Sequence, residues 1–266
     1  MSSPGIGIRL RRIAPSGRAV IIPMDHGVSS GPVQGLERPA EAVYKASRGG
    51  ATAVVVHKGL VPVVATSLGE AGLIVHLSAS TSLNPDTNDK RLVGSVAEAA
   101  RLGADAISVH VNVGAPTESR MISDLGAVSR ACTEHGMPLL AMMYPRGPGI
   151  EDPHDVALVK QVARLGAELG ADLIKCPYTG DVATFEQVVE TCPVPVVISG
   201  GPRMDTPEDV LSMVAGAVEA GAAGVSIGRN AFQAEAPTAM VRAMRSLILD
   251  GQSLEKVLEA GPLESA

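Results

Sequence analysis

The sequence predicts an α/β fold, a single (β/α)8 TIM barrel that occupies residues 1–266 as one domain. Three observations lead to this prediction. Short apolar runs alternate with longer amphipathic stretches, the apolar runs number eight, and several helix ends repeat one glycine signal. A chain of 266 residues, 45% of them hydrophobic, can bury the core of one such barrel.

The apolar runs are rich in Val, Ile and Leu, and they have the length of parallel strands buried on both faces. Apolar positions recur at helical spacing between these runs, whereas the stretch 59–72 is too short for a predicted helix. The predicted strands cover residues 19–24, 52–56, 73–78, 106–111, 138–143, 172–176, 194–199 and 224–228. The predicted helices cover residues 38–48, 93–102, 118–135, 153–169, 182–191, 206–220 and 235–248.

Several predicted helices end on glycine just before the next strand. A glycine in the left-handed conformation ends a helix and lets the chain turn directly into a strand. Repeated use of this ending favours one cyclic architecture over two unrelated domains. An open doubly wound sheet is disfavoured, because no GxGxxG motif follows the first strand. The endings are Gly49–Gly50, Gly103–Ala104, Gly170–Ala171 and Gly221–Ala222.

Composition excludes several classes of protein. A balance of 22 basic and 28 acidic residues, without a long basic run, predicts neither a nucleic-acid nor a membrane surface. No membrane-length apolar stretch or secretory signal is visible, which predicts a cytoplasmic protein. Cys132, Cys176 and Cys192 lack CxxC spacing and are expected to be reduced, buried thiols. The tail 261–266 is expected to be frayed.

In such a barrel, reactive side chains follow the carboxyl ends of strands. Lys175 lies inside the sixth apolar run, where burial disfavours the ammonium form and favours the neutral amine that attacks a ketone. A lysine that pairs with a carboxylate at the barrel mouth is the alternative interpretation. Lys58, after the second run, competes for the same role; the residues favour Lys175, which has an apolar neighbour on each side. Lys45, Lys90, Lys160 and Lys256 are interpreted as solvated charges.

Two further strand ends carry side chains suited to proton transfer. Asp25 follows the first strand, where it can move a proton or simply cap the next turn. The phenol of Tyr144, after the fifth strand, can serve the hydroxyl formed at a cleaved bond, or it can be a packing group. Four histidines also follow strands, but without HxH or HxxxH spacing, so no metal site is predicted. They are His26, His57, His76 and His110.

Two glycine-containing loops predict a phosphate site. The sequence SGGP covers residues 199–202 after the seventh strand, and SIGRN covers 226–230 after the eighth. Backbone N–H groups without bulky side chains can approach a phosphate, and helix starts behind the loops would add dipole attraction. Arg229 supplies a charge-assisted contact. The expected ligand is therefore a small phosphorylated molecule.

The motifs IPMDHGVSSGP, HVNVG, AMMYPRG, LGAELGADLIKCPYTGD, VISGGP and AGAAGVSIGRN resemble the DhnA family of archaeal-type class I aldolases over nearly the whole chain. The resemblance implies that Lys175 forms a Schiff base, that Asp25 accepts protons and that Tyr144 donates one. It also implies no metal or organic cofactor, because the imine withdraws the electrons. Around the phosphorylated substrate it places Asp25, His26, Gly27, Val28, Ser29, Tyr144, Pro145, Arg146, Lys175, Gly200, Gly201, Gly228 and Arg229.

Three reactions of that family share the lysine. One transfers a carbon unit from a phosphorylated 2,5-diketo-hexose to L-aspartate semialdehyde, on an alternative route to dehydroquinate and the aromatic amino acids. The second cleaves fructose bisphosphate, and the third joins aspartate semialdehyde to dihydroxyacetone phosphate. The first is favoured over the second because Met143 stands before Tyr144, where the aldolases carry a bulky aromatic residue.

The resemblance also implies the partners of this chain. They are a small phosphorylated keto-sugar, an aldehyde acceptor, and further copies of the chain in a homo-oligomer of rings or stacked rings, such as a decamer. A noncatalytic phosphosugar-binding barrel is the alternative from another class. An isomerase-like barrel that uses Asp25 and His26 without a covalent step is a further one.

Overall fold

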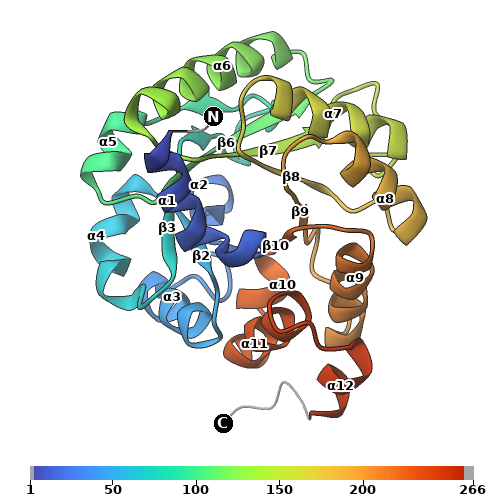
Figure 1. Ribbon diagram of the computed structural model, residues 1–266. Coiled ribbons are helices and arrows are strands. Elements are labelled where there is room, and N and C mark those ends of the chain that lie inside the picture. The colour runs from blue at the N-terminus through green and yellow to red at the C-terminus, as the bar shows by residue number, and fades with distance from the viewer. Residues whose placement is uncertain (1–2, 261–266) are drawn as a thin grey trace.

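The computed structural model describes residues 3–260 and confirms the predicted barrel (Figure 1). The tail expected to be frayed, residues 261–266, lies outside the described residues. Parallel strands close in the order β1-β10-β9-β8-β7-β6-β3-β2. Their bounds are β1 (Ala19–Pro23), β2 (Ala53–His57), β3 (Gly72–His76), β6 (Ala106–Val113), β7 (Leu139–Pro145), β8 (Leu173–Pro177), β9 (Val196–Ser199) and β10 (Gly224–Ser226).

The predicted helices surround the strands as an outer layer (Figure 1). The stretch 59–72, where no helix is predicted, forms only short turns: η2 (Lys58–Leu60), α4 (Val61–Val64) and η3 (Ala65–Ser67). The main outer helices are α3 (Pro39–Arg48), α5 (Val96–Arg101), α6 (Glu118–His135), α7 (Val156–Glu168), α8 (Val182–Thr191), α9 (Pro207–Glu219) and α11 (Pro237–Ile248).

The glycine endings have the expected backbone conformation. The φ angles of Gly50, Gly103, Gly170 and Gly221 are 86°, 84°, 93° and 90°. These values lie in the region that favours glycine, so each helix stops there and the chain enters the next strand. The sequence signal that favoured one repeating architecture is thereby confirmed.

Side chains of each strand alternate between two apolar layers. One set points into the barrel and forms a core with members such as Ile21, Ile74 and Leu140. The other set points outward and packs against the helices, as Val54 and Val75 do. The same alternation turns the last inward residue of each strand toward the carboxyl-terminal mouth.

A helix that the sequence did not predict closes the opposite end of the barrel. In α1 (Pro4–Ile13), the side chain of Ile13 is buried in the inner core. Arg12 Nη1 lies 2.9 Å from Asp105 Oδ1, and Arg9 Nη1 donates to the carbonyl of Gly136 at 3.0 Å. Figure 1 shows α1 lying across the ring of strands. These contacts hold the helix against the amino-terminal ends of β3 and β6.

The other unpredicted elements are short. They include η1 (Pro15–Gly17), α2 (His26–Ser30), α10 (Arg229–Phe232), α12 (Leu254–Glu259), and the antiparallel pair of β4 (Ser78–Ala79) and β5 (Arg91–Leu92). Two of these elements, α2 and α10, directly follow the barrel strands β1 and β10. The β4–β5 pair belongs to the long connection after β3. All three features lie at the carboxyl-terminal mouth.

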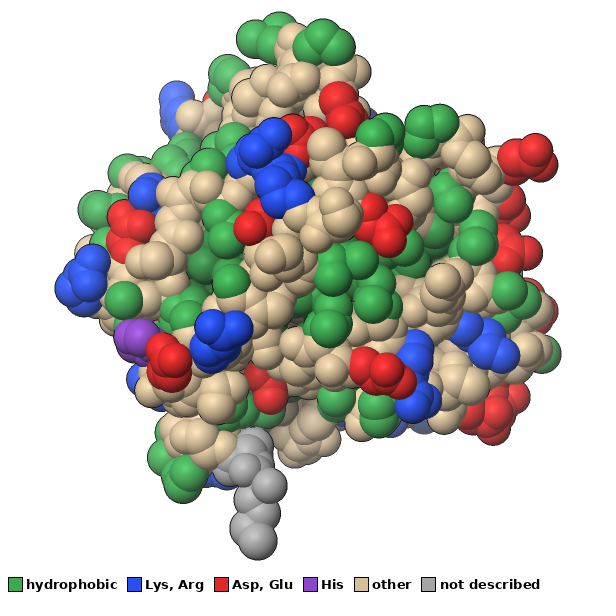
Figure 2. Space-filling view, turned by 90° about the horizontal axis from the view of Figure 1, so that it is seen from above, with side chains coloured by type: hydrophobic (Ala, Val, Ile, Leu, Met, Phe, Trp, Pro, Cys, Tyr) green, Lys and Arg blue, Asp and Glu red, His purple; other side chains and the backbone are tan. Residues whose placement is uncertain are grey.

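The surface charges agree with the nearly balanced numbers of acidic and basic residues in the sequence. On the face shown in Figure 2, acidic and basic side chains are interspersed. Among residues 3–260, no helix combines the length and apolarity needed to cross a membrane. Cys132, Cys176 and Cys192 are buried and free, as expected.

Candidate active site

A cavity of about 310 Å³ opens at the carboxyl-terminal end of the barrel. Its wall combines residues from β7, β8 and the loops after β1, β9 and β10, which are far apart in the sequence. Of the predicted site residues, it brings together His26, Tyr144, Arg146, Lys175, Gly200, Gly201, Gly228 and Arg229. The wall also contains Ser199, Pro202 and Ser226 from the two predicted glycine-containing loops, and Pro23, Pro153, His154 and Pro177, which the sequence did not single out.

Five predicted site residues do not line this cavity: Asp25, which is described below, and four others. Gly27, Val28 and Ser29 belong to the short helix α2, and Val28 is exposed. Pro145 follows Tyr144 on β7 and therefore faces the other side of the strand. Direct contact between these four residues and a substrate stays a prediction.

Lys175 lies near the end of β8 with only 6% of its surface exposed. The strand turns its side chain inward, in register with Met142 of β7 and Val197 of β9. Within residues 3–260, its amine makes no ion pair or hydrogen bond. The alternative of a lysine held by a carboxylate is therefore not seen, and the amine is available to a ligand in the cavity.

Lys58, the competing lysine, is committed elsewhere. Its Nζ donates to Glu98 of α5, at 3.0 Å from Oε1 and 3.1 Å from Oε2. The Lys58 side chain is 42% exposed, and it does not line the cavity. This contact supports the choice of Lys175 over Lys58.

Asp25 occupies the N-cap position of α2, but its side chain makes no capping hydrogen bond and lies among basic side chains. Its Oδ2 is 3.7 Å from His76 Nε2, and its Oδ1 is 3.9 Å from His26 Nδ1. Burial by itself raises the pKa of the Asp25 carboxyl, but His76, His26 and Lys175 outweigh it and hold that pKa well below its usual range. Asp25 is therefore an ionised carboxylate at neutral pH, in the state needed to accept a proton.

The buried histidines at the mouth are neutral. Burial lowers the pKa of His76 to about 4 and holds the pKa of His110 well below its ordinary value, and it also lowers the pKa of His57. His76 Nδ1 lies 2.8 Å from Ser108 Oγ, which fixes the ring beside Asp25. Across residues 3–260, no three His, Cys, Asp or Glu side chains form a group that could hold a metal ion.

Acidification is expected to destabilise the protein through His76. The pKa of its imidazole falls from 6.5 in a model compound to about 4 in the folded chain, because burial outweighs the attraction of Asp25. Between these two pKa values the unfolded chain binds a proton that the folded chain does not, so the free energy of unfolding falls as the pH falls. From pH 7 to pH 5, this one group should remove about 2 kcal/mol.

Urea unfolding at pH 7 and pH 5 measures this loss. The His76→Gln variant should lose less stability between the two pH values than the wild type. His135→Gln, on the exposed end of α6, is the control and should lose as much as the wild type. Asp25 does not contribute in this window, because its carboxyl is ionised in both the folded and the unfolded chain. An unchanged pH dependence in His76→Gln would assign the effect to other groups.

The ring of Tyr144 is held between two neighbours at the mouth. Its centroid lies 4.8 Å from that of His110, and the guanidinium carbon of Arg146 lies 4.5 Å from the ring centroid. His110 is itself fixed, with Nε2 at 2.8 Å from Asn112 Oδ1. These contacts orient Tyr144 in the same cavity wall as Lys175.

Met143, next to Tyr144, does not face the cavity. It belongs to the outer apolar layer, where β7 packs against α7 beside Gly166. The inward neighbour is Met142. The residue on which the sequence comparison of synthase and aldolase rests therefore does not touch the site.

The loops after β9 and β10 are joined by a residue that the sequence analysis missed. Asn230 donates through Nδ2 to the carbonyls of Gly200 and Pro202, at 2.8 and 3.0 Å. Arg229 Nη2 donates to the carbonyl of Gly201 at 2.8 Å. The signal for Asn230 was an amide at the end of the SIGRN motif, where a buried side chain must find hydrogen-bond partners.

Space at these loops requires glycine. A Cβ on Gly228 would lie 2.7 Å from His26 Cε1 and 2.8 Å from the carbonyl oxygen of Pro23. Only this second loop runs directly into a helix, and α10 has a single turn; α9 begins at Pro207, beyond the first loop. The expected attraction from helix starts is therefore smaller than predicted, and backbone N–H groups and Arg229 are the main candidates to hold an anion.

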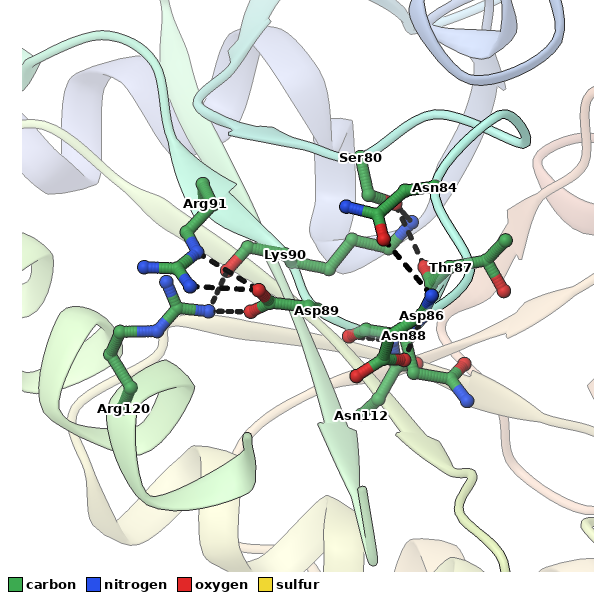
Figure 3. A network of polar contacts seen from close by, with 10 residues as sticks. All are labelled: Ser80, Asn84, Asp86, Thr87, Asn88, Asp89, Lys90, Arg91, Asn112 and Arg120. Atoms are coloured by element: carbon green, nitrogen blue, oxygen red, sulfur yellow. Dashed lines mark hydrogen bonds and ion pairs between the residues drawn. The ribbon is translucent and has the colours of Figure 1, made fainter. Parts of the chain in front are cut away.

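The interpretation of Lys90 as a solvated charge is wrong. It lies in the connection after β3, which returns over the mouth, and its Nζ donates to Ser80 Oγ (Figure 3). Burial, and then the charge of Arg146, lower the pKa of the Lys90 ammonium, while Asp25 raises it. The connection also contacts α2 after β1, where Ser82 N donates to the Ser29 carbonyl at 2.8 Å.

Comparison with protein families finds a match to the model described as DeoC/LacD family aldolase, over residues 19–234. The chain is 44% identical over 252 residues to 2-amino-3,7-dideoxy-D-threo-hept-6-ulosonate synthase 1 of Archaeoglobus fulgidus, with 94% of each chain covered. It is 46% identical over 232 residues to 2-amino-4,5-dihydroxy-6-oxo-7-(phosphonooxy)heptanoate synthase of Streptomyces griseus, which covers 87% of this chain and 85% of that one.

A comparison with solved structures also finds an aldolase that is similar in both fold and sequence. A Schiff base forming fructose-1,6-bisphosphate aldolase superposes with a TM-score of 0.85 and 32% sequence identity. The match covers 91% of this chain and 99% of that chain. The barrel therefore has the fold of a class I aldolase.

Proposed function

Because this chain belongs to the DeoC/LacD family of aldolases, we propose that it forms a Schiff base through Lys175 and transfers a carbon unit to an aldehyde. The activity is that of a 2-amino-3,7-dideoxy-D-threo-hept-6-ulosonate synthase. The donor is a phosphorylated 2,5-diketo-hexose, and the acceptor is L-aspartate semialdehyde. The observation that carries this proposal is the buried, unpaired amine of Lys175, which shares one cavity with Tyr144 and lies close to the ionised Asp25.

The proposed reaction starts when the Lys175 amine attacks a ketone of the donor and water leaves to give an iminium ion. The iminium draws electrons from the adjacent carbon–carbon bond, which breaks as the proton of the neighbouring hydroxyl is transferred through the hydroxyl of Tyr144. Hydroxypyruvaldehyde phosphate leaves, and a three-carbon enamine stays on Lys175. Asp25 accepts a proton from the nitrogen as the amine adds and passes it to the new alkoxide, and a further proton from solvent lets the hydroxyl leave as water.

The second half of the reaction builds the new bond. The enamine carbon attacks the aldehyde of aspartate semialdehyde, and Tyr144 returns its proton to the new alkoxide. Water then hydrolyses the iminium and releases the product from Lys175. Loops around Gly201 and Gly228, with Arg229, would hold the phosphate of the donor so that its ketone meets the amine in a fixed orientation.

The relatives support an amino-acid aldehyde as acceptor. Both synthases named above make a seven-carbon chain with a 2-amino acid at one end, and both share more than 40% identity with this chain. The solved fructose-1,6-bisphosphate aldolase is less similar, at 32%. Condensation of aspartate semialdehyde with dihydroxyacetone phosphate is the second candidate, which the 46% identity to the Streptomyces griseus enzyme favours.

An assay with paired acceptors tests the proposal. With the diketo-hexose phosphate as donor, kcat/KM for L-aspartate semialdehyde should exceed that for glyceraldehyde 3-phosphate by about tenfold or more, because the proposed acceptor carries an amino-acid end. Mass spectrometry of the product identifies the seven-carbon amino acid, and Lys175→Met provides the background. Preference for glyceraldehyde 3-phosphate would instead assign fructose-bisphosphate aldolase activity. A phosphorylated product formed only from dihydroxyacetone phosphate would select the second candidate.

The proposal also includes the surroundings of the reaction. We expect a homo-oligomer of rings, a reaction without a metal or organic cofactor, and a cytoplasmic location. These expectations rest on the family resemblance and on composition.

A further inference from the structure

One lysine is fixed at the mouth of the barrel by its own backbone. The N–H of Lys90 donates to the carbonyl of Asn88 at 3.0 Å, and its carbonyl accepts from Arg120 Nη2 at 3.0 Å. Figure 3 shows this segment as part of a continuous polar network. The position of the Lys90 backbone is therefore set by contacts that leave its ammonium group free to interact elsewhere.

The same segment is attached to the strand beside Tyr144. Asn112, which is fully buried at the end of β6, donates through Nδ2 to the carbonyl of Asn88 at 2.9 Å. Asn112 is also the register partner of Tyr144 on β7. This contact brings Lys90 to the β6–β7 side of the mouth, where Arg146 lies over the Tyr144 ring.

Among the described residues, the two cations on this side have no carboxylate at ion-pairing distance, although Asp25 lies near enough to attract Lys90. Asp89, next to Lys90, is held by Arg91 at 2.9 Å and by Arg120, so its carboxylate is already shared between two arginines. Throughout residues 3–260, neither Lys90 nor Arg146 forms an ion pair with a carboxylate. The polar contact of the Lys90 ammonium is the hydroxyl of Ser80. Arg146 lines the cavity and Lys90 lies in the connection beside it, and an ammonium and a guanidinium that form no ion pair can together bind a ligand anion.

The order of the strands shows on which side of the reacting groups Lys90 lies. The glycine loops follow β9 and β10, and Lys175 lies on β8, next to β9 in the barrel. Tyr144 and Arg146 follow on β7, and then β6 and β3 lead to Lys90. The candidate phosphate loops and the Lys90 side are therefore separated by the amine and the phenol.

We propose that Lys90 is a specificity-determining residue that binds, together with Arg146, the carboxylate of the acceptor aldehyde. The inference rests on the proposed function and refines it. A carboxylate has two oxygens, which one ammonium and one guanidinium can satisfy. None of the residues labelled in the polar network of Figure 3 is a glycine, unlike the loops after β9 and β10, so a carboxylate suits this side better than a second phosphate.

The test uses two acceptors that differ only in the carboxylate: L-aspartate semialdehyde and 3-aminopropanal. In Lys90→Met, KM for aspartate semialdehyde should rise roughly tenfold to a hundredfold, because an ion-paired hydrogen bond is lost. Turnover of 3-aminopropanal should stay within about twofold of the wild type, because it has no carboxylate to lose. Lys90→Arg should restore most of the affinity for aspartate semialdehyde.

Two controls separate this effect from a structural one. Lys45→Met removes a lysine that pairs with Glu41 on the surface of α3 at 2.7 Å, and it should leave KM for both acceptors unchanged. The amount of donor trapped on Lys175 by borohydride, without acceptor, should be equal in Lys90→Met and the wild type. A reduced trapping yield in Lys90→Met would show damage to the donor site and would overturn the assignment.

The outcomes distinguish the inference from the function on which it rests. If the wild type uses aspartate semialdehyde and Lys90→Met has an unchanged KM for it, the role of Lys90 is wrong and the proposed function stands. Equal losses with both acceptors would also overturn the role of Lys90. A wild type that does not turn over aspartate semialdehyde overturns both.

Discussion

Replacement of Lys175 by methionine is expected to abolish the covalent adduct and to lower turnover by at least about 10⁴-fold. Methionine fills a similar volume but has no amine, so no imine can form and the carbon–carbon bond loses its electron sink. The measurement is borohydride reduction in the presence of the donor, followed by mass spectrometry of the peptide that contains residue 175. The wild type should gain the mass of the reduced adduct on this peptide.

Lys58→Met is the matched control for this prediction. Lys58 also follows a barrel strand, but its ammonium pairs with Glu98 outside the cavity. The variant should keep the adduct on Lys175 and most of its turnover. An adduct that persists in Lys175→Met, on the peptide that contains Lys58, would move the covalent chemistry to Lys58.

Replacement of Tyr144 by phenylalanine is expected to lower turnover roughly 10²- to 10⁴-fold, because a positioned proton donor is lost. The ring stays between His110 and Arg146, so the change removes little more than the hydroxyl. Imine formation depends on Lys175 and should continue, so borohydride should still trap the donor. Single-turnover kinetics with the donor separates trapping from bond cleavage.

Tyr178→Phe is the control for the tyrosine prediction. Tyr178 and Tyr144 are both 9% exposed, but Tyr178 packs against Phe185 in the outer layer. Turnover of Tyr178→Phe should stay within about threefold of the wild type, because the change removes one hydroxyl from a residue that does not line the cavity. If Tyr144→Phe keeps wild-type turnover, another group transfers the proton.

Much of the barrel could be predicted because its strands and helix ends are determined locally. Strands such as β1 and β2 are buried on both faces and appear in the sequence as unbroken apolar runs. Glycines such as Gly103 mark the helix ends because the backbone there requires a conformation that other residues rarely adopt. Neither signal depends on residues far away in the chain.

The helix α1 could not be predicted in this way. It is only 10 residues long, contains Gly5 and Gly7, and its value to the fold comes from Ile13 and from contacts with Asp105 and Gly136. These partners lie about 90 or more positions along the chain. Intrinsic helix propensity is weak there, so tertiary contacts decide whether the helix forms.

Only part of the candidate site could be predicted, because the rest also depends on contacts between residues that are distant in the sequence. Lys175 and Lys58 look alike in sequence, and the difference between them is an ion pair with Glu98, 40 residues from Lys58. Lys90 lies in a polar segment and has the composition of a solvated loop. The position of Lys90 at the mouth depends on the contact between Asn112 and Asn88, which are 24 residues apart in the sequence. Such long-range contacts leave no local pattern.

The closure of the barrel base by α1 bears on the timing of the reaction. With Ile13 seated in the inner core, the described chain leaves the carboxyl-terminal mouth as the route to Lys175. In the proposed reaction, the first product must then leave through this mouth before the aldehyde enters through it, which is the order of a ping-pong mechanism. Between these two events the enamine on Lys175 is accessible to water. The ratio of transfer to protonation of the enamine then depends on how quickly the aldehyde binds.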